Sequence, residues 1–198
     1  EGDLAVCTHG RLVRNLADFA FPWRCSEDER RVVEDRVMRV LERVKLPSKG
    51  HYIPLVHAEQ RELRFLLERR LITDDLVRAD GPRGVYVSDD QGMCIMVNGL
   101  HHLHIQVAAA GLQPQEVWAQ LNAVDDQLAK HLDFAFDPQR GYLGPELSSL
   151  GTGLHLSAML HLPALTLANK MRPLIQSLRD QWHVLDGVFK GPNDVKGD

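Results

Sequence analysis

Residues in two separate stretches of the chain could bind phosphate or act as nucleophiles. Arg11 and Arg14 lie in one basic stretch, and each could hold an anion or pair with a carboxylate inside the fold. Gly151-Thr152-Gly153 is similar to a piece of a phosphate loop, but it lacks the lysine of a P-loop and the spacing of a dinucleotide fingerprint. Ser148 and Ser149 have no base partner that the sequence reveals. The pattern permits anion binding and gives no indication of a hydrolase.

The cysteines and a pair of acids carry weaker signals. Cys7, Cys25 and Cys94 are an odd number without a Cys-x-x-Cys pair, which predicts neither a disulfide scaffold nor a cysteine zinc site. This usage is typical of the reducing cytoplasm, which is the localisation we expect. Asp125 and Asp126 fall on the polar side of a predicted helix, so we expect both to be solvated surface.

Length and composition predict one globular domain over residues 1–198. The hydrophobic share of 44% and the charged share of 25% are near the averages for such domains. The net charge of -4 argues against nucleic-acid binding through bulk charge. We also expect no membrane partner, because no apolar run approaches the roughly 18 residues that cross a bilayer and the first residues lack a signal-peptide pattern.

The hydrophobic pattern predicts strands and helices that do not alternate strictly. Strands are predicted over residues 4–15, 84–87, 93–98, 101–109 and 184–189, with an apolar segment over 154–162. Helices are predicted from a Ser26 cap to about residue 44, and over 57–71, 114–131 and 164–180, the last with Pro173 inside it. Residues 134–153 are predicted to be a loop. This order favours an α+β fold with an antiparallel sheet over a doubly wound fold.

Seven stretches occur in the order and spacing of a known family. They are residues 11–19, 87–90, 95–98, 102–106, 141–143, 151–154 and 161–165. Together they resemble the catalytic domain of the ATP:guanido phosphotransferases, or phosphagen kinases, and most closely the bacterial protein-arginine kinase branch. The resemblance implies a glutamine-synthetase-like fold: a curved antiparallel sheet flanked by helices, with Mg-ATP and a guanidinium substrate meeting on the concave face. The family's distal C-terminal region is expected to be absent from this single domain.

Phosphoryl transfer to a guanidinium needs cations around the triphosphate and a carboxylate that deprotonates the acceptor nitrogen. The resemblance places these groups at positions that this sequence fills differently. In the family motif Ser-Ser-Arg-x-Arg, His9 replaces the first arginine and Arg11 keeps the second. In Asn-Glu-Glu-Asp-His-x-Arg, Gly99 and Leu100 replace the two acidic candidates for the base, and His104 replaces the arginine.

Later motifs depart in the same way. Glu146 stands where the family has a reactive cysteine, His155 where Gly-Thr-Gly-x-Arg has its arginine, and Leu185-Asp186-Gly187 where an Arg-Gly pair is expected. A hydrogen bond to a charged group is worth roughly 1.5–3 kcal/mol, and losing a general base costs a factor of about 10²–10⁴ in rate. Because histidine is mostly neutral at pH 7, we expect ordinary family catalysis to be lost.

The leading interpretation is a degenerate protein-arginine kinase-like domain, a pseudokinase, that acts by binding. We expect the partner to be a protein or an arginine- or phosphoarginine-containing peptide. The family's habit of dimerising implies a homodimer, or a heterodimer with an active relative. In this interpretation no cofactor is required, and Gly99, Leu100 and Glu146 are degenerate catalytic positions.

Two alternatives stay open. An active guanidino or protein-arginine kinase would use Mg-ATP, Glu146 as its carboxylate, and Arg11, His9, His104 and His155 as phosphate contacts. A metal-dependent activity would use the three histidines and Glu146 as ligands, a donor set that suits zinc. His102 and His161 match residues ordinary for the family, and we expect both to be structural.

Overall fold

The computed structural model describes residues 4–179. By residue contacts the chain divides into two compact units, Glu1–Met159 and Leu160–Asp198, which are described separately. The first unit contains all the candidate site residues His9, Arg11, Gly99, Leu100, His104, Glu146 and His155.

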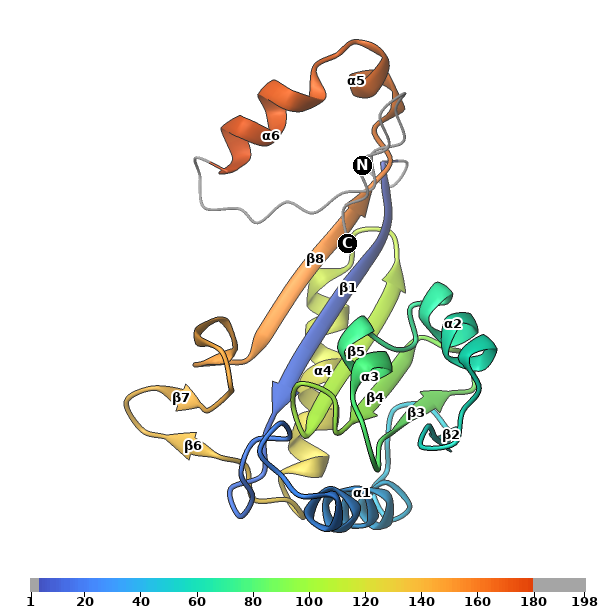
Figure 1. Ribbon diagram of the computed structural model, residues 1–198. Helices are drawn as coiled ribbons and strands as arrows, with labels where there is room; N and C mark the ends of the chain where they lie inside the picture. The colour runs from blue at the N-terminus through green and yellow to red at the C-terminus, as the bar shows by residue number, and fades with distance from the viewer. Residues whose placement is uncertain (1–3, 180–198) are drawn as a thin grey trace. The chain divides into compact units, whose positions relative to one another are not determined.

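A six-stranded sheet in the order β2-β3-β4-β5-β1-β8 forms the centre of the first unit (Figure 1). Its strands are β1 (Ala5–Arg14), β2 (Gly50–Pro54), β3 (Gly84–Ser88), β4 (Met93–Val97), β5 (Leu103–Ala110) and β8 (Leu154–Leu160). The pairs β1–β5, β2–β3, β3–β4 and β4–β5 are antiparallel. The predicted hairpin and the strands predicted over 4–15 and 101–109 are therefore confirmed.

The helices of the first unit are α1 (Glu27–Leu41), α2 (Gln60–Glu68), α3 (Asp74–Arg78) and α4 (Pro114–Leu128). Ser26 caps α1, and the Glu29 carboxylate accepts a hydrogen bond from the Ser26 N–H, which completes a capping box. Pro114 occupies the first turn of α4, where its missing N–H leaves no helical bond unmade. Both helices begin where the sequence predicts, and α2 is shorter than the predicted 57–71.

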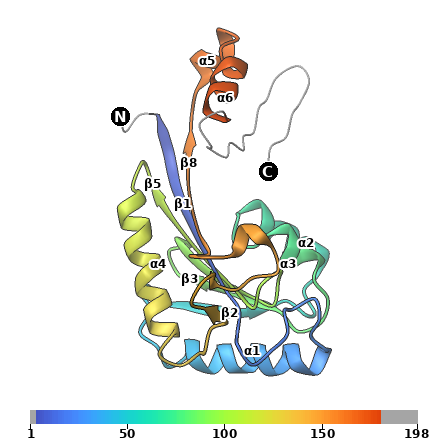
Figure 2. The same cartoon turned by 90° about the vertical axis from the view of Figure 1, so that its left-hand side faces the viewer.

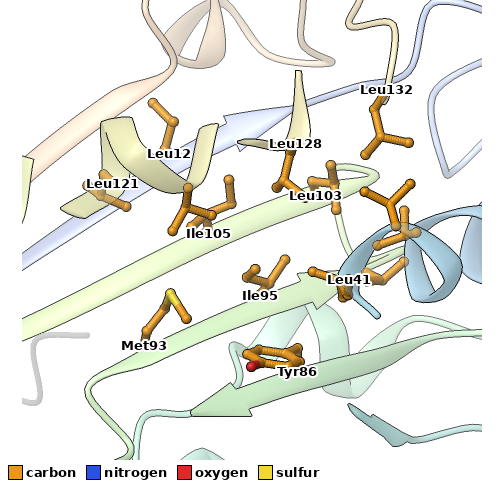
Figure 3. Packing of buried hydrophobic residues seen from close by; sticks show 14 of the residues in the cluster. Leu12, Leu41, Tyr86, Met93, Ile95, Leu103, Ile105, Leu121, Leu128 and Leu132 are labelled. Atoms are coloured by element: carbon orange, nitrogen blue, oxygen red, sulfur yellow. The ribbon is translucent and has the colours of Figure 1, made fainter. Parts of the chain in front are cut away.

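The helices lie on both faces of the sheet (Figure 2). A large buried cluster joins α1 and α4 to one face, and Leu12, Ile105 and Leu121 lie in it (Figure 3). A smaller cluster joins α2 and α3 to the other face of β3 and β4, with Leu63 and Met96 among its members. The second cluster contains no residue of β1, β5 or β8, so those strands keep one face outside both cores.

Two elements were not predicted, and one predicted loop is partly ordered. β2 is a short edge strand that contains Gly50 and Pro54, residue types that argue against a strand unless it lies at an edge. α3 has five residues, too few for a helical period to be seen. The predicted loop over 134–153 contains the small strands β6 (Phe136–Asp137) and β7 (Gly141–Tyr142) and the 3-10 turn η1 (Leu147–Ser149).

The second unit corrects one prediction. The helix expected over 164–180 is two helices, α5 (Pro163–Leu167) and α6 (Met171–Arg179). They are separated at Asn169, whose φ of 55° is left-handed and ends a right-handed helix. Pro173 lies in the first turn of α6. The strand predicted over 184–189 lies outside the described residues, and no helix within 4–179 is long and apolar enough to cross a membrane.

Candidate functional site

The side chains of β1 alternate between the core and a face that the helical cores leave open. A Cβ built on Gly10 would lie 2.4 Å from Cγ1 of Val117 in α4, so Gly10 faces the core. His9 and Arg11, its neighbours along the strand, therefore point the other way. On β5, Gln106 is paired with Arg11. Paired residues share a face of an antiparallel sheet, so His9, Arg11 and Gln106 lie on one surface. We call this surface the open face.

His104 and His155 extend the open face on both sides of β1. His104 is paired with Val13 across the β1–β5 ladder. On β8, Leu154 packs against the main core and Leu156 approaches the core side of Gly10, so His155 between them lies on the opposite face. The fold thus brings the three histidines and Arg11 to one face, although they come from three strands.

His104 is a neutral imidazole in a polar neighbourhood. Burial lowers its pKa to about 4, because taking the ring out of water penalises the imidazolium. The charges of Arg11, His101 and His155 lower the pKa further, and Asp75 opposes them. Among the described residues Nε2 of His104 has no hydrogen-bond partner and is buried. A ring in this state offers a triphosphate no charge.

His9 is also held in its neutral form. Its Nε2 lies 3.0 Å from the Sγ of Cys7, two residues earlier on the same face. Burial lowers the pKa of His9, and the nearby Arg70 guanidinium lowers it again. The group that replaces a family arginine is therefore neutral near pH 7, for the same reason as in His104.

Arg11 is the cation that the open face retains among the four candidate phosphate contacts. Its side chain is exposed, and no carboxylate within residues 4–179 forms an ion pair with it. Of the two roles that the sequence left open, an ion pair with a carboxylate inside the fold is absent over residues 4–179, and anion binding stays a prediction.

Gly99 and Leu100 lie against a carboxylate that the sequence did not reveal. Oδ2 of Asp75, in α3, accepts a hydrogen bond of 3.0 Å from the Leu100 N–H. A Cβ at Gly99 would lie 2.8 Å from the same oxygen. Any side chain at position 99 would therefore push Asp75 aside. The sequence carries no signal for this contact, because α3 is too short to be predicted.

Glu146 lies at the start of the turn η1 (Leu147–Ser149). It precedes η1, and its carbonyl oxygen accepts a 2.8 Å hydrogen bond from the Ser149 hydroxyl. Its side chain is exposed, and its charge favours the protonated form of His101, whose pKa burial nevertheless lowers. Glu146 is thus tied to its own turn and acts electrostatically on His101.

Arg14 and Asp125 form an ion pair inside the fold. This pair corrects the expectation that Asp125 is solvated, and it assigns Arg14 to the structural role that the sequence left open. Asp125 is buried rather than solvated, and its two oxygens accept hydrogen bonds of 2.9 and 2.7 Å from Nε and Nη2 of Arg14. Nη1 of Arg14 donates to the carbonyl oxygens of Val13 and Thr152, both at 2.8 Å. The guanidinium also lies 3.5 Å from the Tyr142 ring centroid. Arg14 is therefore structural, and of the two arginines only Arg11 remains a candidate for anion binding.

His102 is structural, as the sequence predicted. Its Nδ1 accepts a 3.1 Å hydrogen bond from the Leu16 N–H, and its backbone N–H donates a 3.0 Å hydrogen bond to Oδ1 of Asn15. The ring meets Phe19 edge-on. These contacts tie the loop after β4 to the end of β1. His161, expected to be structural too, is exposed.

The open face does not assemble a metal site. Over residues 4–179, no three His, Cys, Asp or Glu side chains are placed so that they could hold one ion. His9, His104, His155 and Glu146 therefore form no such group. The geometry gives the metal-dependent alternative no support.

Solved structures of guanidino kinases share this fold. The substrate-free duplicated taurocyamine kinase from Schistosoma mansoni matches with a TM-score of 0.82 at 21% identity, over 99% of this chain and 29% of that one. Lombricine kinase matches with a TM-score of 0.78 at 20% identity, over 98% of this chain and 57% of that one. The fold is thus the α+β guanidino kinase catalytic fold that the sequence predicted.

The family model of the ATP:guanido phosphotransferase C-terminal catalytic domain matches residues 32–193, and the chain belongs to this family. The protein-arginine kinase of Symbiobacterium thermophilum is 36% identical over 100% of this chain and 57% of its own length. That of Moorella thermoacetica is 32% identical over the same shares. The predicted relation to the bacterial protein-arginine kinase branch is confirmed. The chain spans little more than half the length of these relatives.

Proposed function

We propose that this chain is a binding domain derived from a protein-arginine kinase, with the family fold retained and phosphoryl transfer lost. In this proposal the open face no longer holds a triphosphate in a reactive position. The domain acts instead by recognising a partner.

The charge state of His104 carries the proposal. A triphosphate needs fixed positive charge, and the resemblance assigns an arginine to this position. With a pKa of about 4, the imidazole would have to gain about three units to be charged at pH 7. That gain would consume about 4 kcal/mol of the nucleotide's binding free energy. His9, also neutral, adds to the same deficit.

The missing base supports the same conclusion. Gly99 and Leu100 have no group that could accept a proton from a guanidinium. Asp75 fills the space beside Gly99, and one of its oxygens is engaged by the Leu100 N–H. In this proposal the chain is therefore short of both groups that the reaction needs: positive charge for the triphosphate and a base for the guanidinium.

We infer the class of partner from the charged residues on and beside the open face and from the family to which the chain belongs. We propose a protein or an arginine- or phosphoarginine-containing peptide, bound without nucleotide. An active relative that forms a mixed dimer with this chain is a partner of the same kind. Arg11, which forms no ion pair within residues 4–179, provides a cation for a phosphoryl group, and Asp75 and Glu146 provide negative charge for a guanidinium.

One observation favours the rebuilt kinase as a second candidate. Asp75 acts electrostatically on both His101 and His104, so a carboxylate does lie beside the histidines. If the enzyme were active, Asp75 would be a better candidate for its base than Glu146. Replacement Asp75→Asn would then abolish transfer, whereas Glu146→Gln would leave most of it.

The experiment combines transfer and binding on the whole chain. The protein is incubated with Mg-ATP and an arginine-containing peptide, and phosphoarginine is sought by mass spectrometry under neutral conditions that preserve the N–P bond. Binding of the peptide and of its phosphoarginine form is followed by fluorescence anisotropy without nucleotide. We expect binding and no transfer. Phosphoarginine that forms with wild-type protein and disappears in Asp75→Asn would establish the rebuilt kinase instead.

A further inference from the structure

An apolar groove lies between the strand β2 and the helix α2, at one edge of the sheet. Its volume is about 570 Å³, and most of its lining is apolar. In the sheet order, β3 and β4 separate β2 from β5, β1 and β8, the strands that carry the open face. The groove therefore lies outside the surface that the preceding proposal uses.

The groove forms because α2 does not cover the smaller buried cluster completely. Ile53 of β2 is paired with Val85 of β3, which is fully buried in that cluster, and paired residues share a face of the sheet. Ile53 is nevertheless 38% exposed, and Phe65 of α2, which lines the same groove, is 58% exposed. Leu55 and Leu66 are buried and form part of its floor. Large apolar side chains exposed together in this way are typical of a surface that a partner covers.

The outer edge of β2 offers backbone groups to an additional strand. Hydrogen-bonded and non-hydrogen-bonded pairs alternate along an antiparallel ladder. Because the Leu55 N–H donates to the Arg83 carbonyl, this alternation directs the backbone groups of Ile53 towards β3 and those of Gly50 and Tyr52 away from it. Over residues 4–179 the sheet has no strand beyond β2. The outward groups are thus free to pair with another chain.

Arg61 gives one side of the groove a positive charge. It is exposed, and no carboxylate within residues 4–179 forms an ion pair with it. Glu62, the acidic residue of the lining, is held at the start of α2, where its Oε2 accepts a 2.9 Å hydrogen bond from the Glu59 N–H. The positive end of the helix dipole stabilises that carboxylate. An acidic side chain of a partner therefore complements Arg61.

These features together favour a peptide over a small molecule. The volume is within the range of pockets for drug-sized ligands, about 300–1,000 Å³, so the groove can take two or more side chains. A small molecule would fill the groove alone, whereas an extended peptide would also bond to the outward groups of Gly50 and Tyr52. Pro54 has no N–H, so this pairing is limited to the first residues of β2. Alternate side chains of the added strand would reach the groove.

We propose that the groove and the β2 edge together bind an extended segment of a protein partner, in which apolar and polar side chains alternate and an acidic residue meets Arg61. The backbone of the segment pairs with Gly50 and Tyr52, and its apolar side chains pack on Ile53 and Phe65. This surface is separate from the open face. The proposal therefore goes beyond the proposed function, and it holds for an active kinase as well as for an inactive domain.

The test is a titration of the whole chain with the peptide Thr-Glu-Thr-Leu-Thr-Val-Thr-Glu-Thr, followed by amide chemical shifts in NMR spectra. When this peptide is extended, its leucine, valine and glutamates lie on one face, and a glutamate flanks the apolar pair in either chain direction. We expect saturable shifts over residues 50–54 and 61–66. At saturation, hydrogen exchange of the Gly50 and Tyr52 N–H groups should slow about threefold or more, and that of Ile53 should not change.

Two pairs of variants test the side-chain contacts. Phe65→Gln removes the exposed ring and should weaken peptide binding about fivefold or more. Its control, Val32→Gln, removes an exposed apolar side chain of α1 and should change the affinity less than about twofold. Arg61→Glu should also weaken binding about fivefold, whereas Arg64→Glu makes the same change of charge on α2 outside the groove. A peptide with lysines in place of the glutamates should bind Arg61→Glu more tightly than wild type.

Four results would overturn the proposal. The first is the absence of saturable shifts over residues 50–54 and 61–66, and the second is an equal loss of affinity in each variant and its control. The third is unchanged hydrogen exchange at Gly50 and Tyr52. The fourth is a dependence of the same amide shifts on protein concentration without peptide, because a second copy of the chain would then cover the groove. Each of these results leaves the transfer experiment on the open face unaffected.

Discussion

Two arginines of β1, Arg14 and Arg11, lie in opposite situations. At the end of the strand Arg14 is buried, paired with Asp125 and stacked on Tyr142. Near its middle Arg11 is exposed and unpaired within the described residues, and His9 is neutral. The arginine that holds the fold together has all its partners inside the protein. Arg11 forms no ion pair within residues 4–179, so its charge stays available to an anion.

This contrast is repeated by two histidines, His102 in the loop after β4 and His104 in β5. Burial lowers the pKa of both His102 and His104 to about 4. His102 uses its ring to accept the Leu16 N–H, whereas Nε2 of His104 is buried without a partner among the described residues. Burial without a hydrogen bond is a cost that a structural residue normally avoids. His102 thus contributes a hydrogen bond to the fold, and the described part of the structure gives Nε2 of His104 none.

The largest effect is expected at the buried ion pair. Asp125→Ala leaves the Arg14 guanidinium without its carboxylate, which typically costs about 3–5 kcal/mol of unfolding free energy. Urea denaturation measures the loss. Asp126→Ala removes the neighbouring exposed carboxylate and should cost about 0.5 kcal/mol or less. Similar losses in the two variants would show that the pair does not anchor β1.

The two histidines should differ when each is replaced by leucine. His102→Leu removes the acceptor of a buried N–H and should cost about 1–3 kcal/mol. His104→Leu removes a ring whose Nε2 is buried and unpartnered, so stability should stay the same or rise. Unfolding curves at pH 7 compare them directly. A greater loss of unfolding free energy in His104→Leu than in His102→Leu would contradict this expectation.

Lowering the pH should make His104→Leu more stable relative to the wild-type protein. A histidine whose pKa is about 4 when folded and 6.5 when unfolded takes up more protons in the unfolded chain between these values. Its contribution to stability is therefore intact at pH 7 and lost as the pH falls from about 6.5 towards 4. His104→Leu should gain about 1–2 kcal/mol relative to wild type between pH 7 and pH 5.

The control for this acid effect is His131→Gln, which removes an exposed imidazole. If both variants followed the wild-type curve between pH 7 and pH 5, His104 would not be held neutral by the fold. The charges that act on His104 come from β1, α3, the loop after β4 and β8, through Arg11, Asp75, His101 and His155.

The smallest effect concerns the place of the missing base. Gly99→Ala puts a Cβ 2.8 Å from Oδ2 of Asp75 and should weaken the bond to the Leu100 N–H. We expect a loss of about 1 kcal/mol, measured by thermal unfolding. Gly92→Ala has its nearest contact at 3.5 Å and is the matched control. A neutral Gly99→Ala would mean that Asp75 moves freely and that the space is open.

Much of the fold could be predicted because its elements are long and regular in pattern. The capping box at Ser26 and Pro114 mark the starts of α1 and α4, and alternation marks β1 and β5. The failures were local. Five residues cannot show the period of α3, and an isolated left-handed Asn169 divided one expected helix into two.

The site was predictable only as far as the family motifs extend. Those motifs identified His9, Arg11, His104 and His155, and the fold brings them to one face. Asp75 could not be found because its position depends on a tertiary contact with the loop after β4. Asp125 was misjudged because its helix position is polar by sequence, and the partner that makes its burial tolerable lies 111 residues away.

The most direct test of the central claim is Mg-ATP binding by wild-type protein and by His9→Arg/His104→Arg/His155→Arg, measured by calorimetry. Restored cations should each contribute roughly 1.5–3 kcal/mol, so the variant should bind at least tenfold more tightly than wild type. Should the half-buried position 104 disturb folding, seen by circular dichroism, His9→Arg/His155→Arg gives the same comparison. We expect no saturable Mg-ATP binding by the wild type and a clear gain in affinity when the arginines are restored. Wild-type protein that binds Mg-ATP as tightly as the restored variants would contradict it.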